Sequence, residues 1–77
     1  MRLDQLRLLF EAGDLQTALI LPAMLDASSA PRWELHVKRR NGALVPLCLN
    51  RKRNGAEQVR IFNTLDAAFS AAREIGF

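Results

Sequence analysis

The chain has 77 residues, of which 49% are hydrophobic and 25% are charged. This composition allows one domain with a modest core and excludes a disordered chain, and the longest apolar stretch, residues 19–25, is too short to cross a membrane. The net charge of +3 hides an asymmetry, because residues 31–60 hold eight basic residues against two acidic ones. We therefore expect a single cytoplasmic domain, residues 1–77, whose partner carries negative charge.

The first predicted element is a short helix over residues 4–12. Apolar residues recur there at helical spacing, and Asp4 can cap the start of the helix. Gly13 can end the helix in a left-handed turn.

Residues 15–21 carry a pattern that fits two structures. Alternate residues could line one face of a strand, or Asp14 could cap a second helix. We expect a strand near a sheet edge, because Pro22 cannot donate a hydrogen bond to a neighbouring strand. A polar loop of small residues then follows over residues 26–31.

The middle of the chain predicts a three-stranded antiparallel β-meander. Two Asn-Gly pairs, at residues 41–42 and 54–55, separate three rows of alternating apolar residues. A two-residue turn at the first pair would split these rows between the two faces of the sheet. A three-residue loop that ends in a left-handed glycine, at both turns, places all the rows on one face. The predicted register sets Val37 opposite Val45, Leu35 opposite Leu47, Trp33 opposite Leu49, Leu49 opposite Val59 and Leu47 opposite Ile61.

A second helix closes the predicted fold. Thr64 can cap its start, and Gly76 can end it. Its alanine-rich side should pack on the sheet, with an apolar stripe of Leu65, Ala68, Phe69, Ala72 and Ile75 and a core centred on Trp33, Leu35, Leu47, Ile61 and Phe69. The expected fold class is α+β, with a short N-terminal helix, an antiparallel meander of three or four strands and a C-terminal helix packed on the sheet.

No group of residues indicates catalysis. There is one histidine, the glycines occur singly, and nothing in the sequence fixes a base beside a serine. Cys48 is the only cysteine, which excludes an internal disulfide and a cysteine-based zinc site. We expect no catalytic residue, no metal and no cofactor.

The strongest positive feature is a near-repeat of two basic triplets. Each triplet precedes an Asn-Gly-Ala turn, so the two lie at opposite ends of the predicted sheet and could each hold a phosphate. The alternative is that basic residues beside turns solubilise hairpins and protect sheet edges. The expected nucleic-acid-binding residues are Lys38, Arg39, Arg40, Arg51, Lys52, Arg53 and Arg60.

The predicted register gives the sheet a second face, on which apolar residues lie among basic ones. This face could stack bases or bury itself against a second copy of the chain, unless the N-terminal helix covers it through Leu6 and Phe10. The expected protein-interface residues are His36, Leu44, Pro46 and Phe62.

Several short segments carry a resemblance to known proteins. They are Glu11-Ala12-Gly13, Trp33-Glu34-Leu35, the run from Arg60 to Ala68 and the closing Gly76-Phe77. With these segments the chain resembles small accessory proteins of bacterial plasmids and integrative elements, some of them described as plasmid partition-associated, or ParC-like. The resemblance implies a bacterial mobile-element protein that acts near plasmid maintenance, and it assigns no functional residue. A weaker, fold-level likeness is to domains that lay a three-stranded sheet in a DNA groove.

Together these patterns predict a non-catalytic accessory protein that binds DNA, or a DNA-bound partner, through the basic meander. Because the available contacts are to phosphates, the predicted binding is weak and without sequence preference. The alternative is a protein-interaction module, such as a homodimer or an inhibitor of a host or phage complex, which binds no nucleic acid directly. An acidic protein is the other partner that the charge favours.

Overall fold

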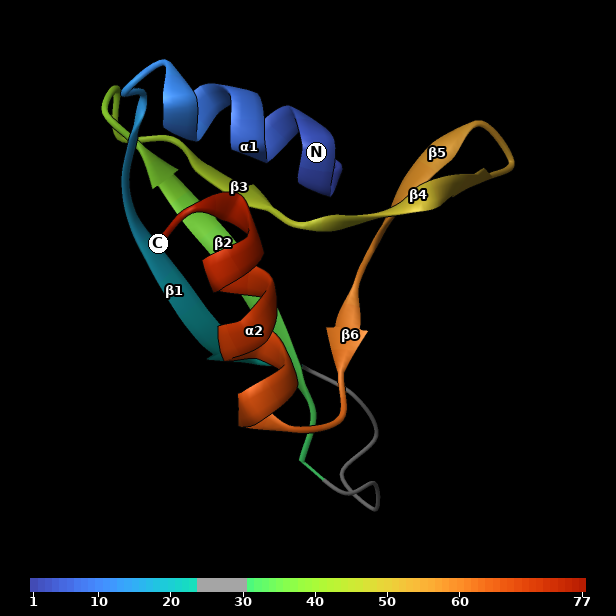
Figure 1. Ribbon diagram of the computed structural model, residues 1–77. Helices are drawn as coiled ribbons and strands as arrows, with labels where there is room; N and C mark the ends of the chain where they lie inside the picture. Colours follow the sequence, from blue (N-terminus) through green and yellow to red (C-terminus); the bar gives the residue numbers. More distant parts are fainter. Residues whose placement is uncertain (24–30) are drawn as a thin grey trace.

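The computed structural model describes residues 1–23 and 31–77 (Figure 1). In chain order the elements are α1 (Leu3–Glu11), β1 (Leu15–Pro22), β2 (Trp33–Arg39), β3 (Leu44–Pro46), β4 (Cys48–Arg53), β5 (Ala56–Val59), β6 (Ile61–Phe62) and α2 (Leu65–Ile75). The loop expected over residues 26–31 lies outside the described residues, apart from Pro31. Within the described part of the chain, neither helix is long and apolar enough to span a membrane.

Strand β2 is the centre of a four-stranded antiparallel sheet. Strand β1 pairs along one side of it, while β3 and β6 share the other side. The predicted strand over residues 15–21 is therefore confirmed, and it lies at an edge of the sheet, as Pro22 suggested. Residues 48–59 leave this sheet between β3 and β6 and form a separate two-stranded hairpin of β4 and β5 (Figure 1).

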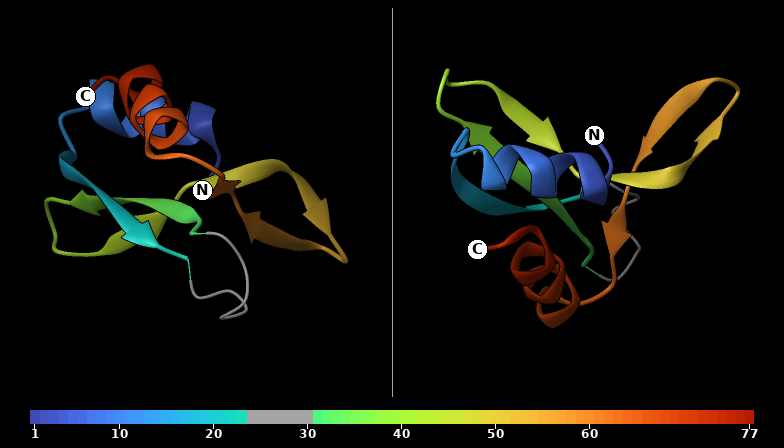
Figure 2. Two further views of the ribbon diagram at one scale, coloured as in Figure 1. Left: turned by 90° about the horizontal axis from the view of Figure 1, so that it is seen from below. Right: turned by 45° about the horizontal axis from the view of Figure 1, so that its top comes forward.

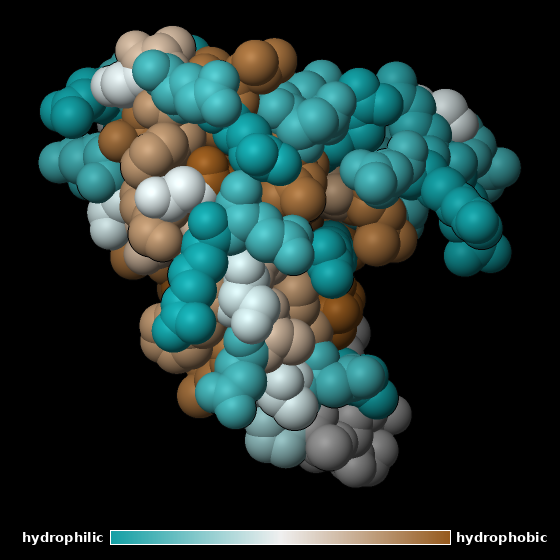
Figure 3. Space-filling model, viewed as in Figure 1, coloured by the Kyte–Doolittle hydropathy of each residue, from teal (hydrophilic) through white to brown (hydrophobic). Residues whose placement is uncertain are grey.

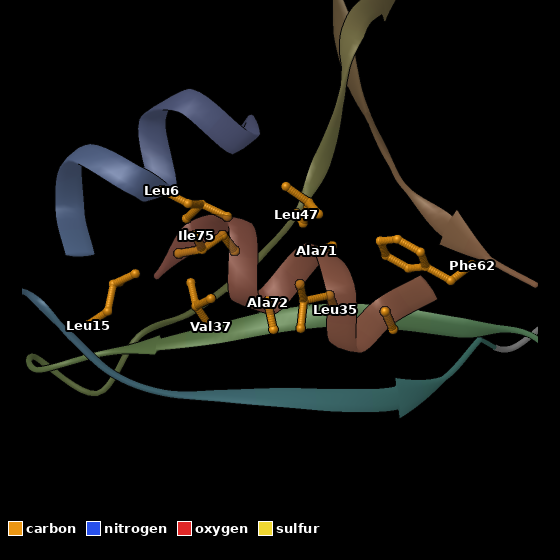
Figure 4. Packing of buried hydrophobic residues seen from close by; sticks show 10 residues of the cluster. Leu6, Leu15, Leu35, Val37, Leu47, Phe62, Ala71, Ala72 and Ile75 are labelled. Atoms are coloured by element: carbon orange, nitrogen blue, oxygen red, sulfur yellow. The ribbon is translucent and has the colours of Figure 1, made fainter. Parts of the chain in front are cut away.

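Both helices lie on the same face of the four-stranded sheet (Figure 2). Leu6 of α1 packs with Leu35 and Val37 of β2 and with Leu47, and all four side chains are fully buried (Figure 4). Helix α2 completes the core with Ala68, Ala71, Ala72 and Ile75. The predicted α+β class, with a C-terminal helix packed on an antiparallel sheet, is confirmed.

The ends of α2 follow the sequence signals. The Thr64 hydroxyl accepts a hydrogen bond from the Ala67 amide at 3.1 Å, and Gly76 ends the helix with a φ of 137°. At the start of α1 the prediction is wrong, because the Gln5 side chain, and not Asp4, accepts the Arg2 amide at 2.9 Å. Asp4 instead lies in the first turn, where its negative charge still interacts favourably with the helix dipole.

The apolar stripe of α2 differs from the prediction. Phe69, which was expected in the core, is 54% exposed, and Leu65, which was expected in the apolar stripe, is 43% exposed. The helix turns its alanines toward β2 instead, and small side chains allow its backbone to approach the sheet closely. The alanine-rich side and Ile75 therefore pack as expected, but Phe69 and Leu65 lie outside the core.

The first hairpin has the predicted register. The Gly42 amide donates to the Arg39 carbonyl at 2.9 Å, and the Arg39 amide donates to the Ala43 carbonyl at 2.8 Å. Gly42 adopts a φ of 92°, and Val37 lies opposite Val45. Burial of one row of side chains has selected the three-residue loop.

The second hairpin does not have the predicted register. Arg53 pairs with Ala56, so the loop has two residues, Asn54 and Gly55, with φ of 53° and 78°. Two left-handed residues are typical of the tight turn that Asn-Gly favours. The pairing shifts by an irregularity between Cys48, which lies opposite Val59, and Lys52, which lies opposite Glu57. The flanking residues are mostly polar, so no buried row opposes the intrinsic preference of Asn-Gly.

This change of register moves Phe62 to the opposite face from the one predicted. Phe62 lies opposite Trp33 and is 3% exposed in the core, while Ile61 is 38% exposed on the other face. The reason is that the chain leaves the sheet after Leu47, so Phe62 takes the place expected for Leu49. Helix α1 also packs on the core face. The alternative prediction, that α1 covers the second face through Leu6 and Phe10, is therefore wrong.

Candidate nucleic-acid interface

Residues 48–59 form a hairpin that projects from the body of the molecule, and we call this hairpin the basic arm (Figures 1 and 2). Arg51, Lys52 and Arg53 follow one another along β4, and all three are exposed. None of the described carboxylates forms an ion pair with them. Hydrophilic side chains cover the arm in Figure 3. The arm therefore offers three long cationic side chains away from the core.

The polar sequence of the arm explains why it projects. Between Leu49 and Val59 its residues are polar, charged, or as small as Gly55 and Ala56, so the two strands have little apolar surface to bury against the body. Leu49 and Val59 are themselves 45% and 36% exposed. An isolated two-stranded hairpin is only marginally stable in water, so contacts at its base decide how well it is held.

The amino terminus provides those contacts. The Cys48 amide donates to the Met1 carbonyl at 2.7 Å, and the Met1 ammonium donates to the Pro46 carbonyl at 3.1 Å. The same ammonium lies 3.1 Å from the Glu57 carboxylate and, by hydrogen bonding and charge, lowers the pKa of Glu57. Glu57 is the one acidic residue of the arm. With its charge offset by the ammonium, the arm presents mainly positive charge.

Helix α1 brings charges of both signs beside the base of the arm. A shallow depression between α1 and β4 is lined by Arg2, Leu3, Asp4, Arg7 and Asn50. The Arg2 guanidinium lies 3.6 Å from the Asp4 carboxylate, while Arg7 is exposed. Arg2 and Arg7 were not among the predicted site residues, because in the sequence they lie among acidic residues and outside the basic segment. Only the packing of α1 beside β4 brings them near it.

The first basic triplet has a different environment. The Arg39 guanidinium forms an ion pair with Asp14, with its Nε donating to Oδ2 at 2.9 Å. Arg40 donates from its backbone amide to the Asp14 carbonyl at 2.8 Å and from Nε to the Gly13 carbonyl at 2.7 Å. These contacts join the turn after α1 to the turn between β2 and β3. Lys38 is partly buried on the sheet face away from the helices.

Arg60 lies at the base of the arm. Its guanidinium carbon is 4.7 Å from the centre of the Phe62 ring, a cation–π arrangement, and its amide donates to the Leu47 carbonyl at 2.9 Å. The side chain is only partly exposed. Arg60 therefore covers the edge of the core while its charge lies close to the arm.

Of the four residues predicted for a protein interface, three lie together. His36, Leu44 and Pro46 share the sheet face away from the helices, which we call the open face, whereas Phe62 is in the core. The His36 Nε2 lies 3.0 Å from the Glu34 carboxylate on that face. By strand alternation and pairing, the open face comprises Thr17, Leu19, Leu21, Glu34, His36, Lys38, Leu44, Pro46 and Ile61.

Residues 1–23 and 31–77 contain no group of three or more histidines, cysteines or carboxylates placed to hold a metal, and Cys48 is buried. Comparisons with models of protein families, with curated proteins and with solved structures gave no match. The relation to plasmid partition-associated proteins stays a prediction. The function of the chain therefore has to be inferred from the basic arm and the surfaces around it.

Proposed function

We propose that this protein is a non-catalytic accessory protein that binds nucleic acid, with DNA as the expected ligand, through the basic arm. The observation that supports the proposal most is the exposure of Arg51, Lys52 and Arg53 on a projecting hairpin whose one acidic residue is held by the amino terminus. A two-stranded ribbon fits the major groove of B-form DNA, where long basic side chains reach phosphates on both sides.

The composition of the arm favours weak binding without sequence preference. Residues 48–59 contain no aromatic side chain that could stack on a base. Contacts to phosphates alone give dissociation constants of about 10⁻⁴ to 10⁻⁶ M at physiological salt. Binding by one arm should lie in that range and fall steeply as salt is added.

The proposal does not depend on both triplets. Arg39 and Arg40 are engaged by Asp14 and Gly13, so their charge is partly used within the body. We assign the main phosphate contacts to the arm, with Arg7 and Arg60 as neighbouring charges. A cytoplasmic protein of a bacterial mobile element, as the sequence resemblance implies, would meet its DNA directly.

Fluorescence anisotropy with a labelled duplex of random sequence tests the proposal at about 50 and 200 mM salt. The variant Arg51→Gln/Arg53→Gln should bind several-fold more weakly, and the slope of log affinity against log salt should fall by about 2. A matched control, Arg40→Gln/Arg73→Gln, removes the same charge from the body and should change both values little.

Two results would contradict the proposal. One is no binding of duplex or single-stranded DNA at about 50 mM salt and micromolar protein, where phosphate contacts are strongest. The other is an equal loss in the arm variant and the body variant, which would mean that net charge alone attracts the duplex. In the first case the basic residues of the arm would be either solubilising charges or a docking site for an acidic protein.

A further inference from the structure

The open face leaves apolar surface uncovered within the described structure. Both helices pack on the other side of the sheet, and four aliphatic side chains of the open face are at least one-third exposed. They are Leu19, Leu21, Leu44 and Ile61. Uncovered apolar side chains gathered on one face of a small domain mark an interaction surface, and the chemistry of that face indicates which partner fits.

Charges of both signs run along the middle of that face. Glu34, His36 and Lys38 alternate along β2 with the core residues between them. Glu34 has Ile61 beside it on β6, and Lys38 has Leu44 beside it on β3. Midway between the two, His36 lies opposite Leu19. One end of the row is therefore acidic, the other basic, and each end has an aliphatic neighbour.

This pattern is complementary to itself under one arrangement of two copies. A two-fold axis that runs between two stacked sheets, across the strands at the level of His36, sets Glu34 of each copy against Lys38 of the other. The same axis sets Leu44 against Ile61 and brings the two Leu19 side chains together. An axis parallel to the strands would instead place Glu34 against Glu34 and Lys38 against Lys38, which like charges oppose.

We propose that the open face binds a second copy of this chain about the axis across the strands. Sheets stack about 10 Å apart, a gap that lysine and glutamate side chains together span. The aliphatic pairs then supply the apolar contact, and the two Glu34–Lys38 pairs fix the direction of the strands. This inference stands apart from nucleic-acid binding, because no residue of the basic arm takes part in it.

Sedimentation equilibrium tests the proposal, with circular dichroism to verify folding. Wild-type protein should be dimeric at about 100 µM, because that concentration lies well above the dissociation constant expected of a modest interface. Leu19→Glu places two carboxylates together at the axis and should give a monomer. Leu8→Glu is the matched control, because Leu8 is 66% exposed on α1, away from the open face; it should remain dimeric.

A charge exchange tests the axis itself. Glu34→Lys and Lys38→Glu should each weaken the dimer by about tenfold or more, because each sets like charges opposite one another. The double variant restores opposite charges across the axis and should recover the dimer. A monomeric wild type overturns the proposal, and so does a dimer that survives Leu19→Glu. If the double variant remains monomeric, the proposed direction of the two-fold axis is wrong.

Discussion

The body of the molecule and the basic arm use the same local signal in opposite ways. Each contains a hairpin with basic residues before an Asn-Gly pair. In the body, the row that includes Val37 and Val45 faces the core, and the turn adopts the three-residue loop that this burial requires. In the arm nothing constrains the turn, and Asn54-Gly55 adopts its intrinsic two-residue form. Burial of the flanking side chains decides which form appears.

The two basic triplets differ in the same way. Arg39 and Arg40 hold two turns together through Asp14 and Gly13, so their charge contributes to the fold. Arg51, Lys52 and Arg53 contact no described carboxylate and remain exposed. Identical residue types thus serve structure in one place and are free to bind a partner in the other. Three matched pairs of substitutions and one pH titration test this difference.

The largest difference should come from equal truncations in the two regions. Leu35→Ala removes a fully buried side chain from the core and should lower the free energy of unfolding by about 2–5 kcal/mol. Leu49→Ala removes the same atoms from the arm, where Leu49 is 45% exposed, and should cost less than about 1 kcal/mol. Urea unfolding followed by circular dichroism measures both. Similar losses would mean that the arm is part of the core.

Valine in place of the two turn glycines should give a smaller difference. Gly42 and Gly55 both have positive φ, and neither has a neighbouring atom that an added Cβ would meet, so the cost is conformational. A left-handed backbone costs a side-chain-bearing residue about 1–2 kcal/mol. Gly42→Val should lose this amount from global stability. Gly55→Val should open the arm instead, which amide hydrogen exchange would detect as faster exchange confined to residues 48–59.

Neutralising one arginine in each triplet should have a modest effect. Arg39→Gln breaks the pair with Asp14, in which both side chains are partly exposed, and should cost about 1 kcal/mol of global stability. Arg53→Gln, which breaks no described ion pair, should stay within about 0.5 kcal/mol. Thermal unfolding of both variants provides the measurement. A larger loss for Arg53→Gln would show that the arm's charges also support the fold.

The smallest effect should be the pH dependence of the arm. The Met1 ammonium lowers the pKa of Glu57 in the folded protein below its ordinary value of 4.5. The pair therefore stabilises the docked arm fully above the unfolded pKa, and this contribution is lost as the pH falls through the lower, folded pKa. Amide chemical shifts near Met1 and Cys48 should follow this transition between neutral and acidic pH. In Glu57→Gln the transition should be absent.

Local signals in the sequence predicted much of the fold. The caps at Thr64 and Gly76 and the edge strand that ends at Pro22 were set by residues within a few positions of each other, while the first turn was set by the burial of one row of side chains. The second register failed because it was inferred from burial in a strand that leaves the sheet. Where the chain leaves depends on contacts distant in sequence, such as the Cys48 amide with the Met1 carbonyl.

The candidate site shows the same limit. The charge of Arg51, Lys52 and Arg53 is visible in the sequence, but the engagement of Arg39 by Asp14, 25 residues away, is not. The placement of Arg7 beside Asn50 also requires the packing of α1. Phe62 was assigned to the wrong face because a change of one position in register exchanges the two faces of a strand.

The hydrogen bond between Leu47 and Arg60 at the base of the arm closes the connection between the sheet and the arm. Its 2.9 Å length means that the chain enters and leaves the arm at almost the same point. Strands β3 and β6, which precede and follow the arm, both pair with β2 and could do so with a shorter or a longer arm between them. The entropy of closing a loop grows only slowly with its length. We therefore expect the arm to tolerate changes of length and charge without a new core.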